Sequence, residues 1–163
     1  MNLRTLFALL VAFALAASLA AQTKISGTLQ CGKADPSYSI PVGDRPGHAF
    51  VIEKGTCTWT KPVEIVGTQS KVHEMTNFHD VMGERVRSRA AAVGTLASGD
   101  KYFLVAQGSS ISKEGVALSF EGTWSYTGGT GKLKGIKGKG TYKGTSNPDG
   151  TITHEVEGEY ILP

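Results

Sequence analysis

Apolar and polar residues alternate along the chain from Thr23 onward, in short runs that end at glycine, proline, asparagine or aspartate. A two-residue period between turn residues is typical of β-strands with one face against a core. The runs predict strands over these ranges: Thr23–Cys31, His48–Thr60, Glu84–Ala97, Lys101–Ser112 and Val116–Thr127. Pro62 ends the second run, and Val63–Gly67 is a short edge strand or a continuation of it. The pattern therefore predicts an all-β fold.

The run from Val116 to Thr127 indicates which side chains point inward. One face is apolar, and the other is mostly polar and includes Glu121, which we expect in solvent. The inward set is Val116, Leu118, Phe120, Gly122, Trp124 and Tyr126. Between Tyr102 and Ile111 both faces carry apolar residues, so both should be covered. A loop or a second subunit would supply the outer cover, and the pattern favours a homo-oligomer.

The last two strands are predicted to form a hairpin. Asn147-Pro148-Asp149-Gly150 is a strong turn, with proline at its second position and glycine at its fourth. If Thr145 pairs with Thr151, opposite charges face each other on the outer surface. The predicted outer pairs are Lys139 with Glu157, Lys137 with Glu159, and Thr141 with Glu155. A slip by one residue would turn the glutamates inward, which favours this register.

The inward face of this hairpin predicts a cavity. Four inward glycines permit sharp bending and close strand approach, and they leave space inside: Gly122, Gly138, Gly140 and Gly158. The residues bordering that space form the candidate ligand-binding wall: Trp124, Tyr126, Tyr142, His154 and Tyr160. His154 beside Tyr142 is the best candidate for acid–base chemistry, and Glu53 is a second. The alternative is a core histidine hydrogen-bonded to a tyrosine.

The segment Trp124–Gly144 is rich in glycine and lysine but lacks a nucleotide-binding motif. In a phosphate-binding loop, Gly131-Lys132 would be followed by serine or threonine, whereas Leu133 stands there. The spacing Gly129-x-Gly131-x-x-x-Gly135 is one residue too long for a dinucleotide fingerprint. We therefore expect no cofactor.

The same segment carries a family resemblance. Trp-Ser-Tyr-Thr-Gly-Gly-Thr-Gly-Lys-Leu, followed by Gly135-Ile-Lys-Gly-Lys-Gly-Thr-Tyr142, resembles the allene oxide cyclase and dirigent-like barrels, and small exported bacterial members above all. The match spans Ser119–Gly144, about a fifth of the chain. It implies a closed antiparallel eight-stranded barrel, often oligomeric, with an apolar small molecule in its lumen. No catalytic residue of that family aligns with this sequence.

Met1–Ala20 is predicted to be an export signal. Arg4 precedes an apolar run over Leu6–Ala17, which is too short to span a bilayer, and small residues precede a cleavage point after Ala20. Residues 21–163 then form one exported barrel domain, periplasmic or secreted. Removing Arg4 lowers the formal net charge from +3 to +2. This small excess argues against nucleic acid as a partner, and no later stretch predicts membrane insertion.

Cys31 and Cys57 are the only cysteines of the chain. Two cysteines in an oxidising compartment most often pair. The bridge would close a loop of about 26 residues and stabilise the fold by roughly 3.5 kcal/mol in the chain-entropy model. We predict a structural disulfide between the first two strands.

Gln69–Gly83 fits neither strand nor helix periodicity, so it is predicted to be a long loop or a hairpin lid. Its four potential metal ligands are His73, Glu74, His79 and Asp80. Histidines six residues apart in a loop do not fix a ligand geometry. We therefore expect no bound metal, and we expect both histidines to be exposed to solvent. Beyond it, Arg85, Arg87 and Arg89 share one strand face, either as an anion-binding stripe or as a solvated surface.

Three functions are compatible with the sequence. The first is a binding protein that holds an apolar or aromatic small molecule in the lumen. The second is a cyclase or isomerase whose cavity folds a reactive substrate and catalyses mainly through orientation. The third is a structural or surface-interaction protein with a filled barrel. No Gly-x-Ser-x-Gly motif or sequence-placed partner for His154 supports a hydrolytic triad.

Overall fold

A computed structural model describes residues 22–113 and 116–163. The strands are β1 (Thr23–Cys31), β2 (Ser37–Pro41), β3 (His48–Lys61), β4 (Glu64–Ile65), β5 (Thr68–Met82), β6 (Arg85–Leu96), β7 (Lys101–Lys113), β8 (Val116–Gly129), β9 (Lys137–Ser146) and β10 (Ile152–Ile161). A single 3-10 turn, η1 (Gly131–Leu133), lies between β8 and β9. The predicted export signal at Met1–Ala20 lies outside the described residues. Within the described part of the chain, no helix has the length and hydropathy needed to cross a membrane.

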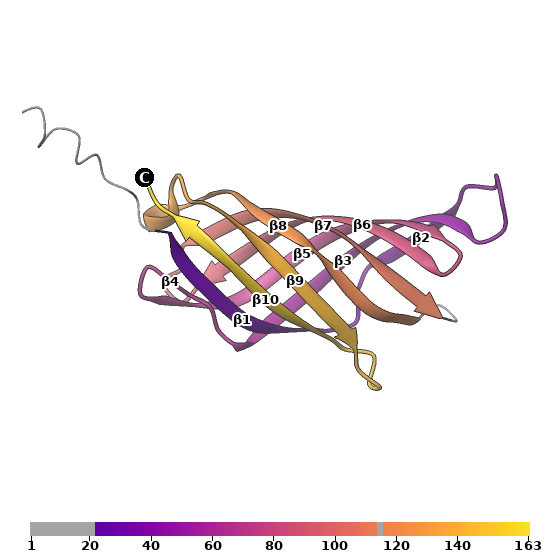
Figure 1. Cartoon of the computed structure of the whole chain (residues 1–163), viewed down its shortest axis with the longest axis horizontal. Helices are drawn as coiled ribbons and strands as arrows, with labels where there is room; N and C mark the ends of the chain where they lie inside the picture. The colour runs from indigo at the N-terminus through magenta and orange to yellow at the C-terminus, as the bar shows by residue number, and fades with distance from the viewer. Residues whose placement is uncertain (1–21, 114–115) are drawn as a thin grey trace, which may run out of the picture.

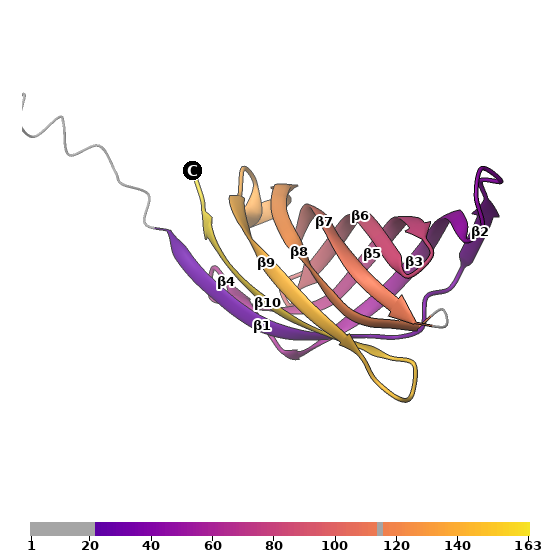
Figure 2. The same ribbon diagram turned by 45° about the vertical axis from the view of Figure 1, so that its right-hand side comes forward.

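Eight of the strands close into an antiparallel barrel. Hydrogen bonding runs in the order β3-β1-β10-β9-β8-β7-β6-β5, and β5 then pairs with β3 to complete the circle. The two remaining strands are additions at the ends, β2 on an edge of β3 and β4 on β5. Figure 1 shows β4 at one end of the barrel and β2 at the other, and Figure 2 shows β2 projecting beyond the wall. The predicted fold class is confirmed.

The predicted loop at Gln69–Gly83 is wrong, because this segment is the long strand β5. Its inward side chains include His73, Asn77 and His79, while its outward side chains include Phe78. Polar and apolar residues therefore occur on both faces, and the contrast that reveals a strand in sequence is lost. The segment between β1 and β3, for which the pattern predicts no strand, contains β2, all five residues of which are exposed.

The β9–β10 hairpin is two residues out of the predicted register. Ser146 pairs with Ile152, and Lys139 faces Glu159 instead of Glu157. The turn Asn147–Gly150 is itself formed, because the Gly150 N–H donates to the Asn147 carbonyl at 3.0 Å. The Asn147 N–H donates to the Thr151 carbonyl, and the side chains of Asn147 and Asp149 also hydrogen-bond to Thr151, so Thr151 is held within the loop. A shift of two preserves which face each side chain occupies. The charged residues therefore remain outside and the glycines inside.

The inward glycines make room for aromatic rings instead of empty space. A Cβ atom at Gly140 would overlap the carbonyl oxygen of Glu157 and lie 2.6 Å from the indole of Trp124, and one at Gly158 would also meet that indole. Tyr142 occupies the equivalent space beside Gly122. The rings lie flat against the wall where it carries no side chain, which is how a narrow barrel accommodates them.

One end of the barrel is filled. Leu133 of η1 and the nearby Ile136 have almost no exposed surface. The same is true of Ile65 in β4 and of Val63, which comes just before β4. They join a larger buried cluster that also includes Ile25, Leu96, Tyr102, Trp124 and Tyr160. β4 and η1 thus close the barrel at the end away from β2 (Figure 1).

The predicted disulfide is confirmed. Cys31 and Cys57 are directly opposite each other on β1 and β3, and their sulfur atoms are bonded. Both are buried next to Leu29 in a second, smaller core cluster. The bond therefore joins two neighbouring strands of the barrel wall, with β2 between them in the sequence.

We predict that Gly140→Ala lowers the free energy of unfolding by roughly 2–3 kcal/mol, because its methyl group has backbone on one side and an indole ring on the other. Urea unfolding followed by tryptophan fluorescence measures this. The control is Gly32→Ala, whose methyl group would have its nearest neighbour at 3.9 Å and should change stability by less than about 0.5 kcal/mol. Equal stability of the two variants would contradict the packing described.

Candidate functional site

Between the filled end and β2, the lumen holds a cavity of about 370 Å³. Val63 and Ile65 form its floor, with exposed fractions of 2% and 1%. Six aromatic side chains contribute to its wall, from Trp59, Tyr102, Phe120, Trp124, Tyr126 and Tyr142. The volume lies within the range of small-molecule pockets, roughly 300–1,000 Å³.

Four of the five predicted wall residues line this cavity: Trp124, Tyr126, Tyr142 and His154. The fifth, Tyr160, belongs to the buried cluster at the filled end, where its hydroxyl accepts a hydrogen bond from the Val66 backbone N–H at 3.1 Å. The indole N–H of Trp124 donates to the Thr141 carbonyl at 3.3 Å. Trp124 is thus tied to the wall, while its ring contacts Tyr126 edge-on.

His154 lies between two aromatic rings. Its imidazole is 5.8 Å from the Phe120 ring and 5.7 Å from the Tyr142 ring, the latter edge-on. Burial lowers the pKa of His154 to about 4 and raises that of Tyr142. His154 is therefore neutral at pH 7 and packs as an aromatic side chain.

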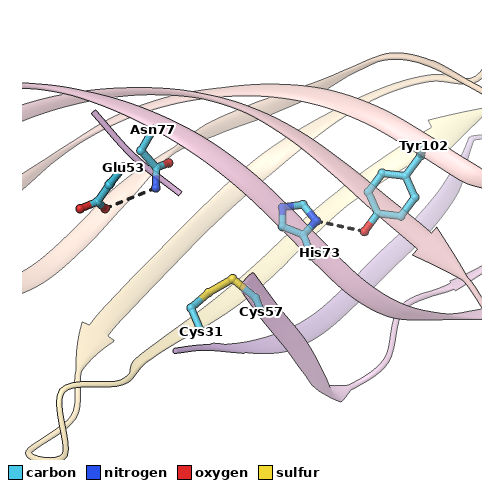
Figure 3. The surroundings of a disulfide bond; sticks show 6 residues. All are labelled: Cys31, Glu53, Cys57, His73, Asn77 and Tyr102. Carbon is cyan, nitrogen blue, oxygen red and sulfur yellow. Dashed lines mark hydrogen bonds between the residues drawn. A yellow bond between two sulfur atoms is a disulfide. The ribbon is translucent and has the colours of Figure 1, made fainter. Parts of the chain in front are cut away.

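His73 was expected in solvent and is instead buried, with 5% of its surface exposed. Its Nδ1 atom is 3.2 Å from the Tyr102 hydroxyl (Figure 3). Burial, and then the proximity of His154, lower the pKa of His73 to about 4. Burial raises the pKa of Tyr102 well above its usual range. The indole N–H of Trp59 lies nearby and lowers this pKa slightly, although it does not form a hydrogen bond with the hydroxyl.

Glu53 belongs to a polar group on a different part of the cavity wall. Its Oε1 atom is 3.1 Å from Nε2 of His79 and accepts a long, 3.5 Å hydrogen bond from the Asn77 amide, drawn in Figure 3. Nδ1 of His79 is 2.7 Å from Oγ of Ser88. The hydrogen bond with His79 holds the pKa of Glu53 below its usual range, although burial opposes this. All four residues line the cavity.

Sequence reasoning named Glu53 as a second candidate, expected His79 in solvent and did not name Ser88. The available signal was the spacing of His73, Met75, Asn77 and His79, which places all four on one face if the segment is a strand. Reading the segment as a loop concealed that relationship. The two histidines then become lumen residues, not solvent-exposed ones.

The four potential metal ligands of this strand lie on opposite faces. His73 and His79 point inward, whereas Glu74 forms an outer ion pair with Lys54 at 3.6 Å and Asp80 contacts His48 at 3.2 Å. Among the residues that the structure describes, no group of three or more histidine, cysteine, aspartate or glutamate side chains could hold a metal ion. Arg85, Arg87 and Arg89 are exposed on the outer face of β6, away from the cavity.

Comparison with known proteins supports the fold. No protein-family model and no curated protein match the sequence. Among solved structures, a pterocarpan synthase dirigent protein has a TM-score of 0.51 at 12% identity, covering 87% of this chain and 86% of its own. Pyocyanin demethylase has a TM-score of 0.42 at 20% identity, covering 82% of this chain and 98% of its own. The likeness to the dirigent protein, at 12% identity, concerns the β-barrel fold alone.

The buried histidines predict a loss of stability in acid. Unfolded histidine titrates near 6.5, whereas His73 and His154 titrate at about 4 in the folded protein. Between these values the unfolded chain binds protons that the folded chain does not. The free energy of unfolding should fall with pH from about 6.5 to about 4, by up to roughly 3 kcal/mol per histidine.

Urea unfolding of the wild type and of His154→Phe at about pH 7.5 and about pH 4.5 tests this prediction. Phenylalanine suits a site between Phe120 and Tyr142 and cannot titrate. The variant should lose about 2–3 kcal/mol less than the wild type between the two pH values. An equal loss would show that His154 is not buried in its neutral form.

Proposed function

We propose that the chain is a binding protein that holds a small apolar or aromatic molecule in the barrel lumen. The observation that carries the proposal is the cavity of about 370 Å³ with several aromatic side chains in its wall. Residues proposed to contact the ligand are Trp124, Tyr126, Tyr142 and His154. Flat rings offer a large contact area at little cost in conformational entropy, which suits an apolar or aromatic ligand. The volume favours binding over a structural role with a filled barrel.

A cyclase or isomerase is the second candidate. The polar group around Glu53 and His79 favours it, because a plain binding cavity for an apolar ligand has no need of a carboxylate. His154 beside Tyr142 is less suited to this role, since its pKa of about 4 makes it a weak base.

We further propose that the chain is a small exported bacterial member of the dirigent-like barrels, residues 21–163 forming the mature domain. The disulfide between Cys31 and Cys57 supports an oxidising compartment. A homo-oligomer is also proposed, because Val105 and Ile111 are 45% and 57% exposed on the outer face of β7. A partner subunit would cover them.

Binding is tested with phenylnaphthylamine, a neutral dye whose fluorescence increases in apolar surroundings. Ala90 and Ala91 are adjacent on β6, with Ala90 lining the cavity and Ala91 exposed outside. Ala90→Phe should weaken dye binding at least tenfold by filling the lumen, and Ala91→Phe should leave it unchanged. Circular dichroism checks that both variants fold.

The opposite pattern, with binding lost only in Ala91→Phe, would place the dye on the outer surface and contradict the proposal. Native mass spectrometry of the wild-type protein from its own host is an independent measurement that needs no variant. A co-purifying small molecule would support binding, and its repeated absence across growth conditions would favour a structural role.

A further inference from the structure

Three side chains from three neighbouring strands form a hydrogen-bonded chain on the cavity wall. His79 of β5 is directly opposite Ser88 of β6, and Glu53 of β3 is opposite Asn77, one inward position before His79. The strand register alone therefore brings a carboxylate, an imidazole and a hydroxyl together in that order. The distances are 3.1 Å from Glu53 to His79 and 2.7 Å from His79 to Ser88.

This group is costly in a lumen that is otherwise mainly apolar. The side chains of Glu53 and His79 are only 24% and 19% exposed, and a carboxylate loses solvation when it is partly buried. An apolar residue at these positions would fill the wall without that cost. His73, deeper in the same lumen, has a tyrosine and no carboxylate as its hydrogen-bond partner. The carboxylate distinguishes His79 from the other lumen histidines.

The chain of hydrogen bonds assigns the protons. The lowered pKa of Glu53 means that it is ionised at neutral pH and can only accept hydrogen bonds. In the neutral imidazole, Nε2 then carries the hydrogen that Glu53 accepts, and Nδ1 has a free lone pair. Ser88 must donate its hydroxyl hydrogen to that lone pair. Its oxygen lone pairs are consequently free to face the cavity, as in a serine nucleophile with an adjacent base.

We propose that Ser88 is a nucleophile for acyl transfer from a small apolar ester bound in the lumen, with His79 as its general base and Glu53 as a positioning residue. The imidazole is used in the opposite sense from serine proteases, where Nε2 faces the serine, but the proton transfers are equivalent. The inference rests on the lumen being open to small molecules, as in the proposed function, and adds a reaction to it.

The steps balance with water as the only co-reactant. The Ser88 oxygen bonds to the ester carbonyl carbon while its proton passes to Nδ1 of His79. The bond to the alkoxy or aryloxy group then breaks, and His79 returns the proton to that leaving oxygen. Water attacks the acyl-Ser88 ester in the same way, which releases a carboxylic acid and restores the hydroxyl. Asn77, on the same wall, has amide hydrogens to stabilise the developing oxyanion.

Phenylmethanesulfonyl fluoride tests the nucleophile directly, because attack by serine forms an O–S bond and expels fluoride. The reagent is small and aromatic, as the cavity requires. Intact mass and peptide mapping should show one adduct, at Ser88, formed at least tenfold faster than at Ser109, an exposed outward serine on β7. Ser88→Ala and His79→Gln should abolish this adduct, whereas Ser109→Ala should not change it.

Glu53→Gln tests the positioning role through the labelling rate. The amide retains the size of the side chain but removes the carboxylate that accepts the Nε2 hydrogen of His79 and so directs Nδ1 toward Ser88. The labelling rate at neutral pH should fall at least tenfold, and Glu53→Asp, which keeps a carboxylate, should restore part of that rate. A Glu53→Gln rate equal to that of the wild type would overturn the role of Glu53.

A wild-type protein that labels Ser88 no faster than Ser109 would overturn the nucleophile, and that measurement depends on no variant. The phenylnaphthylamine assay separates this failure from failure of the proposed function. Dye binding without Ser88 labelling leaves a binding protein whose polar group is structural. Loss of both overturns the two proposals together.

Discussion

The pairing of β3 with β5 is the constraint on which the rest of this structure depends. Without it the strands would form an open twisted sheet with two long unpaired edges, and the aromatic face would be in water. β3 can close the barrel because it is long enough to pair with β1 and β2 along one edge and with β5 along the other. Its C-terminal part pairs with β1, its N-terminal part pairs with β2, and β5 pairs along its other edge from His48 to Thr58. The disulfide lies where β1 and β3 meet and fixes that junction covalently.

Closure gives the lumen two chemically different regions. Toward β4 and η1, apolar side chains and rings packed on glycines form a buried cluster. Toward β2, the inward positions of β3, β5 and β6 carry Glu53, His79 and Ser88, and the space is hollow. The same alternation of side chains along each strand thus produces a core at one end and a polar-edged cavity at the other.

Much of the architecture was predictable from the sequence, because a strand with one apolar and one polar face shows which of its side chains point into the barrel. Val116–Thr127 and the face of the last hairpin are examples. Trp124, Tyr142 and His154 line the cavity, whereas Leu118, which was expected inward, is 54% exposed. The two-residue error in the hairpin register arose in the loop, where Asn147 and Asp149 bind Thr151 through side chains. Such local bonds are not visible in a pattern of hydrophobicity.

The candidate reactive group was not predictable in the same way. A strand that directs His79 and Asn77 inward and Phe78 outward violates the expected contrast, so it resembles a loop. Glu53 could be named alone, but its partners come from strands whose register only the closed barrel determines. The strand whose hydrophobic pattern misled the prediction is also the strand that carries the polar group. This is common at functional sites, where polar side chains replace the apolar ones that a core would have.

The sealed floor at Val63 and Ile65 makes the lumen a blind tube. A molecule that enters the lumen must leave through the same opening, so ligand entry and ligand release use one route. If bonds are cleaved inside, the fragment nearer the opening has to depart before the deeper one. The shape of the lumen would then determine the order of product release, independently of the reaction that takes place in it.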